Sequence, residues 1–200
     1  MKKFILLMPL YFILTGCLSC QEYSFEFNYD TGKVEKTYHG LRSQKGSEDE
    51  NYSIEEDWNT LKKISAEEFG KDLDADVIKP VEAKLFQEDE ALSGKEILQV
   101  QQPKAFPSKT AILERLHNEG DSIADLKFQI LNGEILLFTH ANKIKSANGK
   151  IIRTDKNNIV VWPEEQIEFR FTIYSNNQGG KSLLPFYLEE KKLEEKNKST

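Results

Sequence analysis

The hydrophobic period changes twice along the chain, and this change limits which folds are possible. Residues 23–29 alternate aromatic and polar side chains with a period of two, as in a strand with one buried face. Residues 53–117 repeat their apolar side chains every three or four positions, which is typical of amphipathic helices. From residue 125 to residue 174 the period of two returns. Because strands and helices come in blocks and do not alternate, the pattern predicts an α+β domain and not a parallel α/β sheet.

The first block is expected to form an N-terminal β-hairpin. Asp30, Thr31 and Gly32 supply turn residues, and residues 33–39 can return as the second strand. Such an aromatic face is most often the inner side of a sheet packed on helices, and its alternative role is a hydrophobic groove for an acyl chain or a peptide. The candidate ligand-binding residues of that groove are Tyr23, Phe25, Phe27 and Tyr29.

The middle of the chain predicts several helices. Ser53 opens a capping box with a Glu three positions later, and Ser65 repeats this pattern, so a second short helix is expected there. Residues 77–86 carry a helical apolar stripe, and Ser108 can cap a helix over residues 109–117.

The last block predicts an antiparallel β-meander packed on these helices. Its expected strands are 126–130, 134–139, 151–152, 159–162 and 167–173, joined in part by Asn-Gly and Asn-Asn turns. After Gly179 and Gly180 the chain is rich in Glu and Lys, which fits either a frayed helix or a disordered segment.

The N-terminus has the pattern of a cleaved signal. Two lysines precede an apolar run over residues 4–14, and eleven helical residues span about 16 Å, half of a bilayer core. The run is therefore too short for a transmembrane helix. Leu14-Thr15-Gly16-Cys17 follows at once and resembles a bacterial lipobox, in which the cysteine thiol becomes acylated. The alternative is an ordinary secretory signal in which Cys17 is incidental.

This pattern divides the chain into four parts. We expect a lipoprotein signal peptide at 1–16, a lipidated tether at 17–22, a single α+β domain at 23–176 and a charged tail at 177–200. Palmitate-like chains on Cys17 would hold the protein permanently to a membrane outside the cytoplasm, because two or three chains bind far more tightly than one. Leu18, and not Asp, follows the cysteine, which favours the outer membrane by the sorting rule of enteric bacteria.

Cys20 is the second cysteine and forms a C-x-x-C pattern with Cys17. If acylation consumes the Cys17 sulfur, a redox pair or a metal site at this pattern is excluded. Cys20 could then be an unmodified thiol, a second acylation site or one half of an intermolecular disulfide.

The charge of the chain argues against a nucleic-acid partner. The formal net charge is −6, and nucleic-acid binding needs a basic face. Removal of residues 1–16 takes away two lysines and leaves −8 (−6 − 2).

No motif predicts a metal, a cofactor or a catalytic residue. Asp72, Asp74 and Asp76 resemble the opening of a calcium loop, but Val77 stands where that loop needs Gly. The chain has no H-E-x-x-H, G-x-S-x-G, Walker A or G-x-G-x-x-G motif. Its histidines lie far apart in the sequence, at His39, His117 and His140.

Two short segments resemble a known family. Residues 144–150 and 155–162, with an S-x-N-G turn, a D-x-N turn and a strand ending in Trp162, are similar to the closing part of LppM-like domains (DUF3153 type). The resemblance implies a membrane-anchored extracytoplasmic domain that binds lipid or glycolipid, and it carries over no catalytic residue. The chain departs from the pattern at 139–141, where Thr-His-Ala replaces a Pro-Gly, and it lacks the C-terminal transmembrane helix of many members.

Together these features predict a membrane-anchored envelope lipoprotein that binds lipid or envelope components without turning them over. One alternative is a protein–protein partner in envelope assembly or host contact, which would use an acidic helical surface within residues 47–90. A further alternative is an envelope hydrolase, which would require a cleft where titratable groups converge.

Overall fold

The computed structural model describes residues 18–44, 53–71, 73–118, 126–175 and 179–198. Within these ranges the chain forms three α-helices and thirteen strands, and the strands belong to three sheets whose pairings are antiparallel. The predicted mixed α+β class is confirmed, although sheet dominates. The signal peptide and Cys17 lie outside the described residues.

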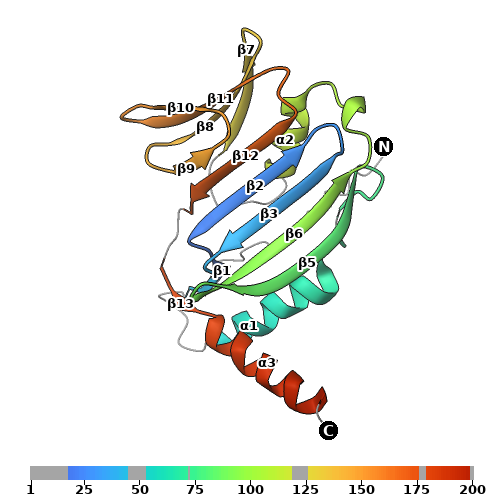
Figure 1. Ribbon diagram of the computed structural model, residues 1–200, viewed down its shortest axis with the longest axis vertical. Helices are drawn as coiled ribbons and strands as arrows, with labels where there is room; N and C mark the ends of the chain where they lie inside the picture. Colours follow the sequence, from blue (N-terminus) through green and yellow to red (C-terminus); the bar gives the residue numbers. More distant parts are fainter. Residues whose placement is uncertain (1–17, 45–52, 72, 119–125, 176–178, 199–200) are drawn as a thin grey trace, which may run out of the picture.

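A six-stranded sheet forms the centre of the molecule (Figure 1). In spatial order its strands are β5 (Ile78–Glu88), β6 (Ala91–Val100), β3 (Lys33–His39), β2 (Glu22–Asn28), β12 (Glu168–Tyr174) and β9 (Ile144–Ala147). The turn between β2 and β3 depends on Gly32, which has a φ of 73°. A Cβ on Gly32 would also collide with the carbonyl oxygen of Val100 on β6. Only glycine fits both demands.

A four-stranded sheet lies beside β12 and carries most of the C-terminal meander (Figure 1). Its strands in spatial order are β10 (Lys150–Arg153), β11 (Asn157–Pro163), β8 (Glu134–His140) and β7 (Lys127–Leu131). Asn132 and Gly133 join β7 to β8 with φ values of 52° and 77°, which is the type I′ turn that suits the twist of a hairpin. The sequence predicts this hairpin correctly.

The third sheet is small and joins both ends of the described chain. It consists of β1 (Leu18–Ser19), β4 (Arg42–Ser43) and β13 (Lys181–Ser182), with β4 in the middle. Leu18 is 4% exposed and Cys20 is 0% exposed. The predicted tether at 17–22 is therefore wrong from Leu18 onward, because these residues pair with β4 and enter the core. The buried Cys20 sulfur is also inaccessible for a second acylation or an intermolecular disulfide.

Three helices complete the domain: α1 (Ile54–Lys63), α2 (Lys109–Asn118) and α3 (Leu184–Lys198). Ser53 forms the predicted capping box, in which Glu56 N donates to Ser53 Oγ at 3.1 Å and Ser53 N donates to a Glu56 carboxylate oxygen at 3.3 Å. The second helix predicted at Ser65 does not start there, because α1 continues directly into a π-helical turn at Ile64–Glu68. The 177–200 tail contains β13 and α3. A short 3-10 helix at Pro103–Ala105 precedes α2.

The helix predicted over 77–86 is wrong, because this segment is the edge strand β5. It pairs with β6 along nearly its whole length, and a register shift between Pro80 and Glu82 accommodates the missing proline N–H. The apolar side chains do not share one face, since Ile78 is buried whereas Val81 is 60% exposed. Pairing with β6 therefore overrides the local helical spacing, and the expected helical middle is interrupted by a β-hairpin.

The core lies between the central sheet, the four-stranded sheet and the helices. Phe25 on β2 stacks on Phe171 of β12 at 5.2 Å and lies 4.3 Å from the ring of His117 on α2. Tyr23, Phe25 and Phe27 are at most 1% exposed, so they form the inner face of the sheet and the alternative of an apolar groove there is wrong. Tyr29 is half-buried and lies beneath the Lys109 ammonium, 5.0 Å from it. These aromatic residues form core.

Within the described ranges, no helix combines the length and the apolar character needed to cross a membrane.

Candidate functional site

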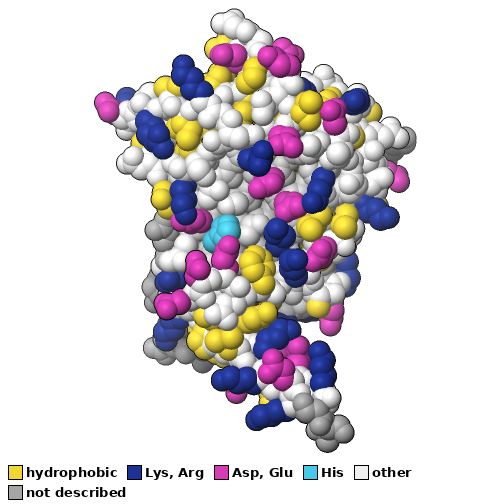
Figure 2. Space-filling model, viewed as in Figure 1, with side chains coloured by type: hydrophobic (Ala, Val, Ile, Leu, Met, Phe, Trp, Pro, Cys, Tyr) yellow, Lys and Arg dark blue, Asp and Glu magenta, His cyan; other side chains and the backbone are white. Residues whose placement is uncertain are grey.

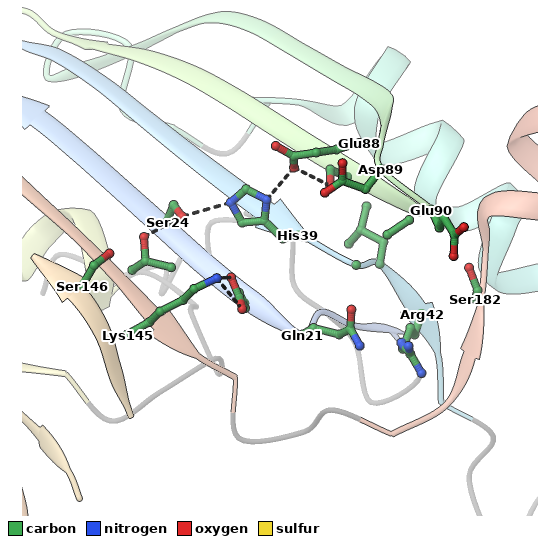
Figure 3. A pocket seen from close by; sticks show the side chains of 16 residues that line it. Gln21, Ser24, His39, Arg42, Glu88, Asp89, Glu90, Lys145, Ser146 and Ser182 are labelled. Atoms are coloured by element: carbon green, nitrogen blue, oxygen red, sulfur yellow. Dashed lines mark hydrogen bonds and ion pairs between the residues drawn. The ribbon is translucent and has the colours of Figure 1, made fainter. Parts of the chain in front are cut away.

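The opposite face of the central sheet carries a polar groove of about 690 Å³. The same alternation that buries Tyr23 and Phe25 turns Glu22 and Ser24 outward. Figure 2 looks onto this face, where basic and acidic side chains lie intermixed. Figure 3 shows the groove, whose polar lining comes from β2 and the residue before it, from β3, β4, β9, β12 and β13, and from β5, β6 and the turn between them. These residues are Gln21, Glu22, Ser24, His39, Arg42, Glu88, Asp89, Glu90, Ser93, Lys145, Ser146, Thr172 and Ser182.

A chain of hydrogen bonds links three of these residues across three strands. Ser24 Oγ lies 3.0 Å from His39 Nε2, and His39 Nδ1 lies 2.7 Å from a carboxylate oxygen of Glu88 (Figure 3). The antiparallel register pairs Glu22 with His39, which places Ser24 and His39 diagonally on the same face of β2 and β3. Glu88 ends β5, and the turn that follows begins with Asp89 at a φ of 52°. The three side chains thus meet because Glu88, next to the β5–β6 turn, extends its side chain to His39 on β3.

The hydrogen bond from His39 holds the pKa of the Glu88 carboxyl below its ordinary value of 4.5. A protonated His39 ring and a 3.2 Å hydrogen bond from Ser93 Oγ act in the same direction, whereas partial burial opposes them. Glu88 is therefore a carboxylate at neutral pH, and a carboxylate only accepts hydrogen bonds.

This charge state fixes one end of the chain. Because Glu88 accepts, His39 Nδ1 carries a proton. When the imidazole is neutral, its Nε2 lone pair accepts from the Ser24 hydroxyl, and Ser24 accepts in turn from Thr172, whose Oγ1 lies 2.9 Å away. A hydroxyl that donates to an imidazole, which itself donates to a carboxylate, is the arrangement of an activated nucleophile.

Lys145 on β9 supplies a cation in the groove. Its ammonium lies 2.8 Å and 2.7 Å from the two carboxylate oxygens of Glu22. The hydrogen bond to Glu22 raises the pKa of Lys145 above 10.5, so the ammonium stays charged at neutral pH.

The groove as a whole is acidic. It is lined by four carboxylates, on Glu22, Glu88, Asp89 and Glu90, and by two basic side chains, on Arg42 and Lys145. Without His39, the charged side chains of the lining sum to −2 (−4 + 2). Such a lining favours neutral or cationic ligands and repels phosphates and other anions.

The same sheet face continues into a smaller pocket of about 320 Å³. Its charges pair with each other, since Glu35 contacts Lys33 at 2.5 Å and Lys95 at 2.9 Å, and Arg170 contacts Glu168 at 2.7 Å. The two lysines lower the pKa of Glu35 below 4.5 through hydrogen bonds. This part of the face is a network of surface ion pairs.

The groove ends at the small sheet that contains β1. Arg42 lines the groove and pairs with Ser19 on β1, and Gln21 N donates to the His39 carbonyl oxygen at 2.8 Å. Cys17 itself lies outside the described residues, but Leu18 is its immediate neighbour in sequence. The predicted lipidation position and the groove are therefore close along the chain.

The structure does not bring the three histidines together. His39 is in the groove, His117 is buried against Phe25 and Phe128, and His140 ends β8 on the surface. In the described part of the chain, no three His, Cys, Asp or Glu side chains are placed to hold a metal ion.

Two other sequence features also lie apart from the groove. Asp72, the first acid of the calcium-like segment, is outside the described residues, and Asp74 Oδ1 accepts from Asp76 N at 3.2 Å in a local turn. The acidic stretch 47–90 does not form one helical surface, because α1 ends at Lys63 and β5 begins at Ile78. The expected acidic helical face for a protein partner is wrong for this reason.

Sequence reasoning missed Ser24, His39 and Glu88 as a group. The predicted hairpin over 23–39 contains the signal for the first two, since its register puts them on the polar face. Glu88 could not be found in this way, because its segment was expected to be helical.

Comparison with known proteins finds no matching family model, no matching curated protein and no matching solved structure. The similarity of residues 144–162 to LppM-like domains therefore stays a prediction.

Proposed function

We propose that this chain is a lipid-anchored protein of the bacterial cell envelope, acylated at Cys17, whose domain binds a polar ligand in the groove on the central sheet. The observation that carries the proposal is that the residue directly after the lipobox-like segment belongs to the folded domain. Leu18, the residue after the proposed lipid attachment point, is paired in β1 and is 4% exposed. Cleavage before Cys17 would remove the signal and leave the domain intact.

The lining of the groove indicates the class of ligand. Carboxylates and hydroxyls line it together, among them Glu22, Asp89, Ser24 and Thr172, and its net charge is negative. Carboxylates accept hydrogen bonds from hydroxyl and ammonium groups, and hydroxyls both donate and accept. The ligand is therefore rich in hydroxyl or amino groups, as the sugars and amino sugars of envelope glycolipids and glycans are.

The turn that resembles LppM-like domains holds together two sheets beside the groove. Trp162 is 0% exposed, and its indole N–H donates to Asn148 Oδ1 at 2.8 Å. The same Asn148 oxygen accepts from Arg170 N on β12 at 2.9 Å. Asn148 thus ties the four-stranded sheet to the strand that carries Thr172. The outer membrane is the proposed location, from the Leu that follows Cys17.

Mass analysis of the N-terminal peptide of the native protein tests the anchor. We expect a peptide that begins at residue 17 and carries a diacylglyceryl group, with membrane association lost in Cys17→Ala. An intact signal sequence or an unmodified Cys17 thiol would contradict the anchor.

Calorimetric titration of the soluble domain, residues 18–200, tests the groove. The probes are a glucosamine trimer, its N-acetylated form and a galacturonate trimer, which are cationic, neutral and anionic. We expect binding of the first two and none of the third, with weaker binding of the cationic probe in Glu22→Gln. Glu134→Gln, which changes an exposed carboxylate on β8, is the matched control. Binding of the anionic trimer alone, or of none of the three, would contradict the groove.

A further inference from the structure

We propose that Ser24 is a nucleophile and that the groove hydrolyses carboxylic esters of its hydroxyl-bearing ligands. The inference rests on the proposed groove but not on the lipid anchor. It departs from the sequence-based expectation of a non-enzymatic module, and its substrates would be esters of neutral or cationic alcohols.

The geometry that points to this activity is the hydrogen-bonded line Ser24–His39–Glu88. Both contacts, at 3.0 Å and 2.7 Å, lie within the range in which a base activates a hydroxyl and a carboxylate orients the base. Such a set is recognised by its geometry and by the roles of its members, not by a sequence motif. The absence of G-x-S-x-G from the chain therefore does not argue against it.

Each member of the line is held by a further contact. Ser93 on β6 donates to the same Glu88 oxygen that His39 contacts, and the two strands β5 and β6 fix the distance between them. His39 sits at the end of β3, where its backbone carbonyl accepts from Gln21 N. Its side chain is 28% exposed, and both His39 and Ser24 line the groove in which a ligand would lie.

Ester hydrolysis at this line of residues would proceed by acylation and then deacylation of Ser24. Ser24 Oγ attacks the ester carbonyl carbon while its proton passes to His39 Nε2. The carbon–oxygen bond to the alcohol breaks, and His39 gives the proton to the departing alkoxide. A water molecule then gives a proton to His39, attacks the acyl-serine and releases the acid as Ser24 regains its proton. Ester and water thus become acid and alcohol, with no oxidant or reductant.

The negative charge that develops on the carbonyl oxygen needs donors near Ser24. Backbone N–H groups of β2 are engaged by β3 and β12, so the donors are side chains. The Thr172 hydroxyl lies 2.9 Å from Ser24 Oγ, and the Lys145 ammonium reaches into the same groove from β9 (Figure 3). Thr172 now contacts Ser24 and Lys145 now contacts Glu22, so each would turn toward the carbonyl oxygen as negative charge develops there.

The test is labelling and turnover in the soluble domain, residues 18–200. The probes are a fluorophosphonate, which traps activated serines, and p-nitrophenyl acetate. We expect the fluorophosphonate on Ser24 and loss of both labelling and turnover in Ser24→Ala. His39→Gln should lower turnover by about 100-fold or more, as for loss of a general base, and Glu88→Gln should lower it by about tenfold or more. Ser65→Ala, which changes a serine outside the groove lining, should react as the unchanged protein does.

A second variant guards against misfolding as an explanation. Ser24→Cys keeps the polar side chain, and its thiol should be alkylated by iodoacetamide faster when His39 is present than in the His39→Gln background. Labelling or turnover that is unchanged in Ser24→Ala, or absent from the unchanged protein while it still binds the glucosamine trimer, overturns the hydrolysis. The latter result leaves the binding function in place. Failure of both binding and labelling would overturn both proposals.

Discussion

At the scale of single residues, the least expected feature is a lysine inside the core. Lys36 on β3 is 1% exposed, and its ammonium donates to the Leu116 carbonyl oxygen at 2.8 Å. Leu116 lies in the last turn of α2, where helix carbonyls lack partners within the helix. Glu96, also 1% exposed, stands opposite Lys36 on β6 and accepts from the Tyr38 hydroxyl at 3.3 Å. Lys36 thus ties the central sheet to α2, and Glu96 is its buried cross-strand neighbour.

Removal of one of these two charges should be costly. We expect Lys36→Met to lower the free energy of unfolding by about 3–5 kcal/mol, because it leaves Glu96 as a buried charge. Lys36→Met combined with Glu96→Leu should recover most of this loss, because the double variant buries no charge. Urea denaturation of the two single variants and the double variant measures the coupling. A double variant as unstable as the sum of the single variants would show that the two residues act independently.

The lowered pKa of Glu88 predicts a pH dependence of stability. A carboxyl whose pKa is lower in the folded than in the unfolded chain stabilises the fold above its unfolded pKa, and this contribution is lost as the pH falls through the folded pKa. Between about pH 5 and about pH 3, the stability advantage of the unchanged protein over Glu88→Gln should therefore shrink. Thermal melts across this range measure it. Glu165→Gln, which changes one exposed carboxylate, is the control, and an advantage that grows on acidification would contradict the assigned His39–Glu88 contact.

Gly149 belongs to the predicted Asn-Gly turn, but glycine is required there for a different reason than the one the motif suggests. Asn148 and Gly149 read as a turn that needs positive φ, but neither is among the described residues that adopt it. A Cβ on Gly149 would instead lie 2.7 Å from both Trp162 Nε1 and the Val161 carbonyl oxygen. The glycine is required because the Trp162 ring passes so close. Sequence alone shows the Asn-Gly pair but not the tryptophan that packs on it.

At the scale of elements, predictions succeed where one short segment contains its own cause. The β7–β8 hairpin follows from Asn132 and Gly133, and the start of α1 follows from Ser53 and Glu56. The prediction for residues 77–86 is wrong because β5 forms by pairing with β6, and the helical spacing of its apolar residues does not show this pairing. The sequence does not predict the groove for the same reason, since Glu88 contacts His39 only when β5 is paired with β6.

The capping box of α1 gives a prediction at this scale. Ser53→Ala removes the acceptor for Glu56 N and should lower the free energy of unfolding by about 1 kcal/mol. Ser53→Thr keeps a hydroxyl acceptor and should cost only a fraction of this amount. Urea denaturation compares the two variants. Equal losses in both would show that the Ser53 side chain acts through packing and not through the cap.

At the scale of the whole molecule, no linker separates the proposed lipid attachment point from the paired residue Leu18. Leu18 pairs with Ser43 on β4 and directly follows Cys17 in the sequence, and one residue spans at most about 3.6 Å. β1 pairs with β4, and β4 pairs with β13, which leads through Leu183 into α3. Both ends of the described chain therefore meet in one small sheet beside the groove (Figure 1). A domain attached in this way would act at the membrane surface and not at a distance from it.

Deletion of residues 18–20 distinguishes a folded anchor segment from a tether. The soluble domain that begins at Gln21 would lose the buried side chains of Leu18 and Cys20 and the pairing of β1 with β4. Full burial of one leucine side chain contributes about 1.5–3 kcal/mol, so we expect the deletion to lower the free energy of unfolding by at least about 2 kcal/mol. Thermal and urea denaturation of the domains that begin at Leu18 and at Gln21 provide the comparison. Deletion of the last three described residues of α3, 196–198, removes the same number of residues from exposed positions and is the control. Equal stability of the Leu18 and Gln21 domains would mean that the first residues after the lipobox are a tether after all, and that the groove can move away from the bilayer.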